Sequence, residues 1–483
     1  MRTGSKEAAQ AGTMTSDPER LHLGTAADLL SYIPHAIGFL PVESLVVLML
    51  SGGRVGATLR VDLPGAGAEA GSYAEGVAAI LASDTAADGA VMILYTDTRW
   101  SEPGRPPYGR MVRELERTLR AAGTPLRDGW VVSGTAWREY FCADTRCCPW
   151  PGRPLTEISD STASAELVLR GSSFSPSVET AAALPPGPAV AGEPSVEALA
   201  ASYRRRCART WTTASQFRAT LLVWDHLLSG RRPPLGRQEH ETAAFLLAGL
   251  SCKAIRDSVL VLAGCGLEAA EGGARACGAV GGPGLPEMVP VVPSADAGGP
   301  LALEAPGGRG PGGSPDGAQR ARRGSAYAAP GGDPGGGPDG GPRAGRGGNP
   351  DGSLGRESIG FIGNVPLPAG ERAGACRRYT DFLVGRSSEA PRWDTLDAAH
   401  DLLLRLAALS AGESQAAVHS MLGWIEFARG RGSLAYVYLE RAERACPGYR
   451  LAGLLKELVL RGGLPEWACS ADTAWSGRRG RPG

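Results

Sequence analysis

The sequence predicts an α/β N-terminal domain followed by an α-helical C-terminal domain, with a long Gly/Pro-rich insert that we expect to be disordered. Before residue 190, short apolar runs typical of strands alternate with helical segments, a pattern that indicates an α/β sheet. From about residue 196 the apolar residues recur at helical spacing. Between residues 271 and 355, 40 of the 85 positions are glycine or proline. Such a segment cannot bury enough apolar surface to offset its ordering entropy.

The elements of the predicted sheet follow in order from these runs. Residues 44–50 are apolar throughout after Ser44, as expected for a strand buried on both faces. Residues 55–63 alternate between apolar and polar side chains after a turn at 51–54, so the two segments form a hairpin. Later segments predict a helix over 73–87, a strand over 90–95, a helix over 111–119 that ends at Gly123, and a strand over 130–132. The sheet therefore has at least four strands.

The second part of the chain is predicted to be helical. Its clearest segment has apolar residues three or four positions apart, which define one face of a helix. These residues are Trp211, Ala214, Phe217, Leu221, Trp224 and Leu228. Helices continue over 243–250 and 254–263 and resume after the insert, from about 393 to 461.

Small residues near the C-terminus predict a helical hairpin. Gly423, Ala435, Ala442 and Pro447 are spaced as in one tetratricopeptide repeat, in which small residues lie where two antiparallel helices touch and a proline ends the second helix. The neighbouring 34-residue windows do not keep the pattern. Because one repeat cannot bury its own faces, we interpret this segment as a structural hairpin packed on the rest of the protein.

These patterns divide the chain into six segments. We predict a disordered tail over 1–20, an α/β domain over 21–190, a helical region over 191–265, a disordered insert over 266–356, a second helical region with the hairpin over 357–467, and a flexible tail over 468–483.

Several segments together resemble a bacterial family known as domain of unknown function 4192. They are Pro34-His35-Ala-Ile-Gly-Phe-Leu-Pro-Val-Glu-Ser-Leu-Val-Val, Leu59-Arg-Val-Asp-Leu-Pro, Tyr140-Phe-Cys-Ala-Asp-Thr-Arg-Cys-Cys-Pro with Gly152, and the C-terminal hairpin through Leu451-Ala452. The resemblance covers roughly 21–265 and 357–467, and the insert departs from the family pattern. It implies the extent of the domains, and it implies no reaction or ligand.

The charges exclude two classes of function. The 50 basic and 50 acidic residues give a formal net charge of zero, which excludes bulk electrostatic capture of nucleic acid or of an anionic membrane. None of the three lysines, Lys6, Lys253 and Lys456, follows a glycine, so the chain has no phosphate-binding P-loop.

The sequence also indicates a cytoplasmic protein. Residues 1–20 lack the apolar run of a signal peptide, and the most apolar stretch, residues 39–50, is too short to span a membrane. We therefore expect the ten cysteines to lie in a reducing compartment, where structural disulfides are uncommon.

Three cysteines are the best candidates for chemistry. Cys142, Cys147 and Cys148 offer three thiols within seven residues, and zinc prefers four sulfur or nitrogen ligands. The spacing is irregular, and a fourth ligand would come from a distant residue such as His35 or Cys207. We therefore favour buried structural thiols in an apolar setting, and zinc binding is the alternative. We therefore expect no cofactor, and zinc is the one alternative.

A second candidate site is a small-ligand crevice that includes His35, Asp62 and Asp97. Asp62 and Asp97 follow predicted strands, and ligands of open α/β sheets bind at strand ends. The same carboxylates could instead cap turns, and His35 could bond the backbone of a turn.

The absence of a complete catalytic set favours a non-enzymatic protein that acts through contacts with a protein partner or through a small-ligand crevice. The alternative is a metal-binding or hydrolytic enzyme that uses His35, Asp62, Asp97 and the three cysteines. Clustering of these residues at one sheet edge would favour the enzyme.

Overall fold

The computed structural model describes residues 21–65, 68–82, 84–102, 104–185, 195–230, 237–281, 289–293, 368–461, 463–470 and 472–477. These residues belong to one compact unit. The predicted N-terminal tail, most of the predicted insert and the last residues of the predicted C-terminal tail lie outside the described ranges, so their disorder stays a prediction.

A six-stranded mixed sheet with the order β2-β1-β3-β4-β5-β6 forms the first part of the described chain. Only β3 and β4 run parallel, and the other neighbouring strands pair antiparallel. The prediction of an α/β sheet is thus confirmed in its mixed form. The strands are β1 (Ser44–Ser51), β2 (Arg54–Asp62), β3 (Gly89–Tyr95), β4 (Leu126–Val132), β5 (Ala136–Glu139) and β6 (Arg153–Pro154).

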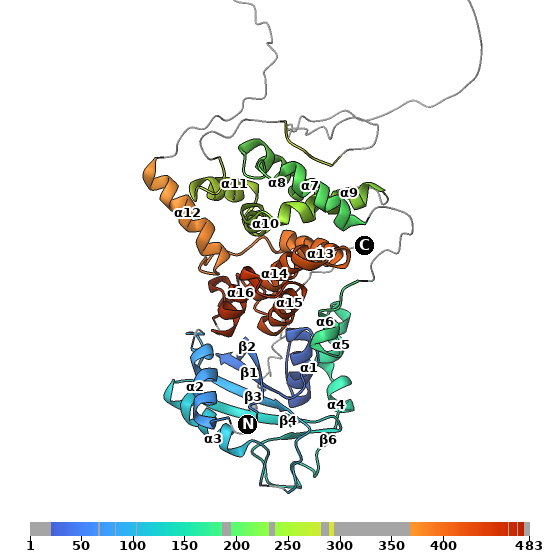
Figure 1. Ribbon diagram of the computed structural model, residues 1–483. Coiled ribbons are helices and arrows are strands. Elements are labelled where there is room, and N and C mark those ends of the chain that lie inside the picture. Colours follow the sequence, from blue (N-terminus) through green and yellow to red (C-terminus); the bar gives the residue numbers. More distant parts are fainter. Residues whose placement is uncertain are drawn as a thin grey trace, which may run out of the picture. The chain divides into compact units, whose positions relative to one another are not determined.

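Helices cover both faces of this sheet (Figure 1). In β1, Val47 and Met49 pack with α2 and α3, whereas Val46 and Leu48 pack with α1 and α4. Successive side chains of a strand point to opposite faces, so a strand between two helical layers must be apolar at every position. The helices are α1 (Ala26–Ile37), α2 (Ala70–Leu81), α3 (Gly109–Ala121), α4 (Thr156–Ser159), α5 (Thr162–Leu169) and α6 (Val178–Ala181).

The two predicted helical regions form a single core. Helices from both sides of the insert contribute its largest buried side chains, among them Phe217, Trp224, Trp424 and Trp467. The order of elements is α7 (Val196–Cys207), α8 (Ala214–Leu228), α9 (Arg237–Leu250), α10 (Lys253–Cys265), α11 (Leu267–Ala276), α12 (Ala369–Leu383), α13 (Trp393–Leu409), α14 (Gly412–Ala428), α15 (Gly432–Ala445), α16 (Arg450–Leu460) and the 3-10 helix η1 (Glu466–Ala468).

Helix α11 corrects the predicted start of the insert. Its residues, 267–276, lie in the range that we assigned to the disordered insert from residue 266. The glycines of this helix are typical of a loop when only the sequence is considered. In the structure, however, a Cβ on Gly273 would lie 2.4 Å from the Tyr379 ring of α12. The small residue therefore permits close packing of two helices, which holds α11 in the core.

The structure also differs from the expectation that the cysteines are free. Cys277, next to the end of α11, forms a disulfide with Cys376 of α12, 99 residues away. The other eight cysteines are free thiols. The pairing has no local sequence signal, because the packing of α11 against α12 brings the two residues together.

Helices α14 and α15 make the predicted close contact. A Cβ on Gly423 would lie 2.8 Å from Leu439 Cγ and 3.2 Å from the Ala435 carbonyl oxygen. Ala435 and Ala442 are fully buried, and Pro447 follows the end of α15. The structure thus places these small residues inside the hairpin, and their likeness to a tetratricopeptide repeat stays a prediction.

We expect Ala435→Leu to destabilise the protein by about 1–3 kcal/mol, because Ala435 is fully buried where α14 and α15 pack closely and a larger side chain would overpack this contact. Thermal and urea unfolding would measure the change. The matched control is Ala373→Leu at an exposed position of α12, where we expect a change within about 0.5 kcal/mol. Equal stabilities for the two variants would contradict close packing in the hairpin.

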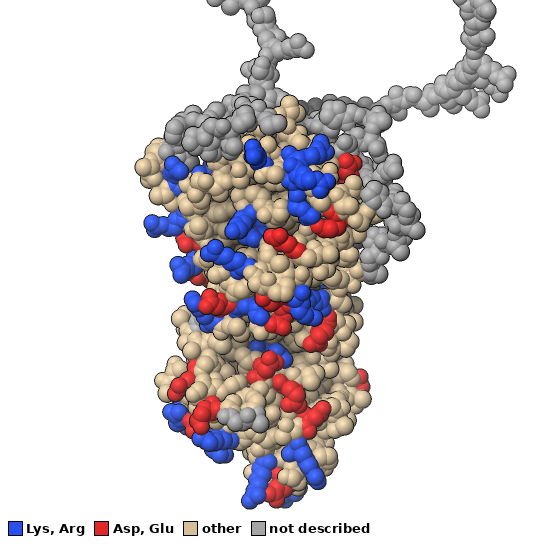
Figure 2. Space-filling view, viewed as in Figure 1, with Lys and Arg blue, Asp and Glu red and all other residues tan. Residues whose placement is uncertain are grey.

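The distribution of surface charge and the length and apolar character of the helices concern possible contact with a membrane. Figure 2 shows basic and acidic side chains interspersed in small groups over the visible face, which agrees with the formal net charge of zero. Within the described residues, no helix combines the length and apolar character needed to cross a membrane.

Candidate functional site

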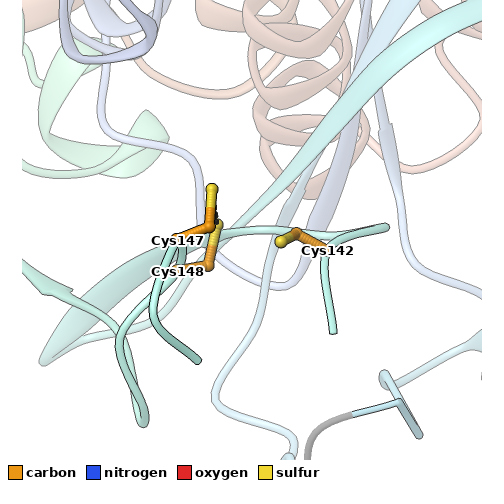
Figure 3. A group of neighbouring side chains, drawn as sticks. All are labelled: Cys142, Cys147 and Cys148. Carbon is orange, nitrogen blue, oxygen red and sulfur yellow. Dashed lines mark hydrogen bonds between the residues drawn. The ribbon is translucent and has the colours of Figure 1, made fainter. Parts of the chain in front are cut away.

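The three predicted cysteines meet in the loop between β5 and β6. Their Sγ atoms all lie within 4.8 Å of one another, and those of Cys147 and Cys148 are 4.0 Å apart. Figure 3 shows the Cys142 side chain directed toward the other two. A tight turn brings this about, because the backbone N–H of Cys148 donates to the Asp144 carbonyl and the N–H of Arg146 donates to the Asp144 carboxylate.

A buried arginine holds both ends of this loop. The guanidinium of Arg138, on β5, donates to the carbonyls of Cys142 (3.0 Å) and Pro149 (3.1 Å). It also lies over the rings of Trp100 and Trp150, at 5.2 Å and 5.1 Å from their centroids. Arg138 is 3% exposed, so the cysteine loop is fixed to the sheet by a group that cannot easily move away.

The thiols differ in exposure, and a carboxylate lies beside one of them. Cys148 is buried, Cys142 is half-buried and Cys147 is exposed. The Cys148 thiol lies 3.8 Å from Glu139 Oε2 at the end of β5. Burial, followed by hydrogen bonds with Cys142 and Cys147, raises the pKa of the Cys148 thiol to about 12.

The expectation of three thiols buried in an apolar setting is therefore wrong for two of them. The loop lies near the edge of the sheet and outside the hydrophobic cores, and its flanking residues Phe141 and Trp150 are themselves partly exposed, at 47% and 36%. Only Cys148 is shielded as a structural thiol would be.

A cavity of about 520 Å³ adjoins the cluster. Cys147 and Cys148 line it together with charged and aromatic side chains, among them Arg138, Glu139 and Trp137. The cysteine loop thus forms one wall of a space large enough for a small molecule.

The distant residues that we considered as a fourth metal ligand do not join the cluster. Cys207 is fully buried in the helical core, and His35 belongs to the last turn of α1. Within the described ranges, the three cysteines are the only group of three or more His, Cys, Asp or Glu side chains that lie close enough together to hold a metal ion. Glu139 is instead the nearby side chain with a suitable oxygen.

His35 differs in its local structure from our expectation of a turn. It lies in α1, where its Nδ1 is 2.9 Å from the Ser172 hydroxyl oxygen and its ring meets Phe174 edge-on. Burial lowers the pKa of His35 below its usual value. The side chain thus connects α1 to the segment that follows α5.

Asp62 and Asp97 lie at one end of the sheet, since Ser44 pairs with both Asp62 and Tyr95. Asp62 is 80% exposed and forms an ion pair with Arg60 at 2.7 Å. The Asp97 carboxylate accepts the Gly134 N–H at 2.7 Å, as a turn cap does.

The cysteine loop leaves the sheet at the opposite end from these aspartates. Strand β5 runs antiparallel to β4, and Glu139 pairs with Trp130 while Trp137 pairs with Val132. The structure therefore does not bring His35, Asp62 and Asp97 together with the cysteines. A ligand crevice formed by those three residues stays a prediction.

Sequence reasoning missed Arg138 and Glu139. Both precede the cysteine motif by only a few residues, which is the one signal that could have singled them out. Their roles depend on the loop folding back over β5, and that geometry has no sequence pattern.

Comparison with known proteins gives one match. A family model described as a domain of unknown function (DUF4192) matches residues 27–275 and 392–466, more than half of the chain. The matched ranges include the sheet, the cysteine loop and the C-terminal hairpin. No curated protein and no solved structure was found to match.

Proposed function

The chain belongs to the family described as a domain of unknown function (DUF4192), and we propose that it binds a zinc ion through Cys142, Cys147 and Cys148. The observation that carries the proposal is the convergence of the three Sγ atoms within 4.8 Å. Thiolates are the ligands that zinc prefers in structural sites. Each thiol that binds the metal releases its proton to solvent.

Glu139 is the fourth ligand in this proposal. Its Oε2 is 3.8 Å from the Cys148 Sγ, and carboxylate oxygen completes four-coordinate zinc sites in proteins. Three thiolates and one carboxylate around Zn²⁺ leave a formal charge of about −2. The guanidinium of Arg138, which already bonds the loop backbone, offsets part of that charge.

The zinc ion in this proposal stabilises the loop between β5 and β6. This loop has few side chains in the hydrophobic cores, so metal–thiolate bonds would replace the missing apolar contacts. The protein would then be a non-enzymatic cytoplasmic zinc protein, with the ion beside the 520 Å³ cavity.

The test is metal analysis of the full chain, purified in reducing buffer without added metal. We expect about one zinc per chain and a lower melting temperature after chelation. Cys147→Ser should lose most of the zinc, and its exposed position leaves the fold intact. The control is Cys265→Ser, another exposed free cysteine, which should keep the metal.

Glu139→Gln distinguishes the fourth ligand, with an expected loss of at least 10-fold in zinc affinity. Substitution of cobalt for zinc should give the absorption of a tetrahedral thiolate site, and Cys147→Ser should abolish it. A wild-type chain that takes up no more zinc than Cys147→Ser, even when zinc is added, would overturn the proposal.

The cavity favours a second candidate function, the binding of a small molecule beside the metal. Its lining combines the aromatic rings of Trp130 and Trp137 with the charges of Arg138 and Glu157, as binding pockets commonly do. The absorption spectrum of the cobalt-loaded protein would also detect the binding of a small molecule. A ligand that contacts Cys147 or Cys148 changes the ligand field of the metal and therefore the spectrum.

A further inference from the structure

A second cavity, of about 470 Å³, lies on the helical part of the chain and shares no residue with the cysteine site. It is lined by Leu184, Gln415, His419, Arg441, Arg444 and Ala445. Two arginines and a histidine thus meet at one cavity, and its lining contains no carboxylate.

His419 is a buried polar group with an unused nitrogen. The residue is 3% exposed, and its Nδ1 has no hydrogen-bond partner among the described residues. Its ring stacks on Tyr438 at 6.2 Å between centroids. Burial, and then the charges of Arg441 and Arg444, lowers the pKa of His419 to about 4. The imidazole is therefore neutral at pH 7 in a region of positive potential.

Backbone contacts hold one of the arginines in place. The guanidinium of Arg441 donates to the carbonyls of Ala182 and Glu179, and it lies over the Tyr438 ring at 5.7 Å from the centroid. Arg444 is exposed at the rim of the cavity. Within the described part of the chain, no carboxylate oxygen lies within ion-pair distance of either guanidinium.

The acidic side chains near this cavity have closer partners than Arg441 and Arg444. The Glu440 carboxylate pairs with Lys456 at 2.7 Å, and that of Glu443 accepts the Gly448 N–H at 2.8 Å. Hydrogen bonds from its own backbone and from Ser177 hold the pKa of Glu179 below its usual value. Glu179 still interacts electrostatically with Arg441, and Glu440 with Arg444, but neither carboxylate forms an ion pair with these arginines.

We propose that this cavity binds the phosphate group of a small molecule. Guanidinium groups match the geometry of phosphate oxygens, and neutral His419 would donate to a further oxygen when its ring proton is on Nδ1. The cavity exceeds the volume of inorganic phosphate, so it also has room for the organic part of a phosphorylated metabolite. This site is independent of the zinc site.

The test is calorimetric titration of the full chain with inorganic phosphate, and with acetate at the same ionic strength. We expect saturable one-to-one binding of phosphate and at least 10-fold weaker binding of acetate. Arg444→Gln should weaken phosphate binding at least 10-fold, and because Arg444 is exposed this variant should fold normally. His419→Gln should weaken it as well.

Arg405→Gln provides the control, since it removes the same charge from an exposed position on α13 that lines neither cavity. Its phosphate affinity should equal that of the unmodified chain. The proposal is overturned by equal phosphate affinities in Arg444→Gln and Arg405→Gln, by acetate binding as tight as phosphate binding, or by no saturable binding of phosphate at millimolar concentration.

Discussion

Glu426→Gln is expected to lower the free energy of unfolding by about 3–5 kcal/mol, because it removes one partner from a buried charge network. Glu426 is 2% exposed and forms an ion pair with Arg429 at the end of α14. Arg429 also pairs with Asp397 of α13, and His400 Nε2 lies 3.0 Å from Glu426 Oε1. The loss of Glu426 would leave the buried guanidinium of Arg429 with a single carboxylate partner.

The matched control is Glu457→Gln on α16. Glu457 pairs with Arg461 across one helical turn, and its side chain is 66% exposed. Exposed pairs of this kind contribute little, so we expect a change within about 0.5 kcal/mol. Urea unfolding of both variants measures the difference. Similar values for the two would show that the buried network does not stabilise the fold.

The dependence of stability on pH provides a second readout for Glu426. Burial raises its pKa, but the charges of Arg429, His400 and Arg431 outweigh burial, so the pKa lies far below the usual range. A carboxyl group with a lowered pKa in the folded state stabilises the protein above its unfolded pKa of about 4.5. That contribution is lost as the pH falls further, so the gap between wild type and Glu426→Gln should narrow below about pH 4.5.

Strands β1 and β3 could be predicted from the sequence because they lie between two layers of helices. A strand between two helical layers has no position for a polar side chain, so β1 and β3 show in the sequence as apolar runs. The hairpin between β1 and β2 was predictable for a different reason. Gly52 and Gly53 both adopt positive φ, at 55° and 78°, which favours glycine at a two-residue turn.

For the candidate sites, the sequence shows residues that are close along the chain, and it does not show residues that only the fold brings together. Cys142, Cys147 and Cys148 lie within seven residues, so the sequence shows the group even though the fold decides whether the thiols meet. His419 and Arg441 lie on different helices, and only the packing of α14 against α15 places them at one cavity. The Cys277–Cys376 disulfide depends on packing across a separation of 99 residues, which no local pattern records.

The role of a glycine inside a helix was the feature that the sequence predicted least well. Gly264 of α10 lies where a Cβ would be 2.1 Å from Phe382 Cζ of α12, whereas Gly453 of α16 has open space around it. Both read simply as weak helix formers. The structure shows that the first permits a helix contact and that the second does not.

We expect Gly264→Ala to destabilise the protein by about 3 kcal/mol, although alanine is the better helix former. Phe382 cannot retreat, since its ring is 2% exposed and lies 5.3 Å from the ring centroids of both Trp424 and Trp467. Those rings are fixed in turn, because Trp424 Nε1 donates to the Leu383 carbonyl and Trp467 Nε1 donates to the Ala428 carbonyl.

Gly453→Ala is the matched substitution and should raise the stability by about 0.5–1 kcal/mol, because an exposed helical glycine only loses backbone freedom. Thermal and urea unfolding of both variants would measure the expected loss of stability in Gly264→Ala and the expected gain in Gly453→Ala. Phe382→Leu should restore part of the loss in the Gly264→Ala background, since the shorter side chain removes the clash and couples the two sites. If both glycine variants gain stability, α10 and α12 do not pack closely at this point.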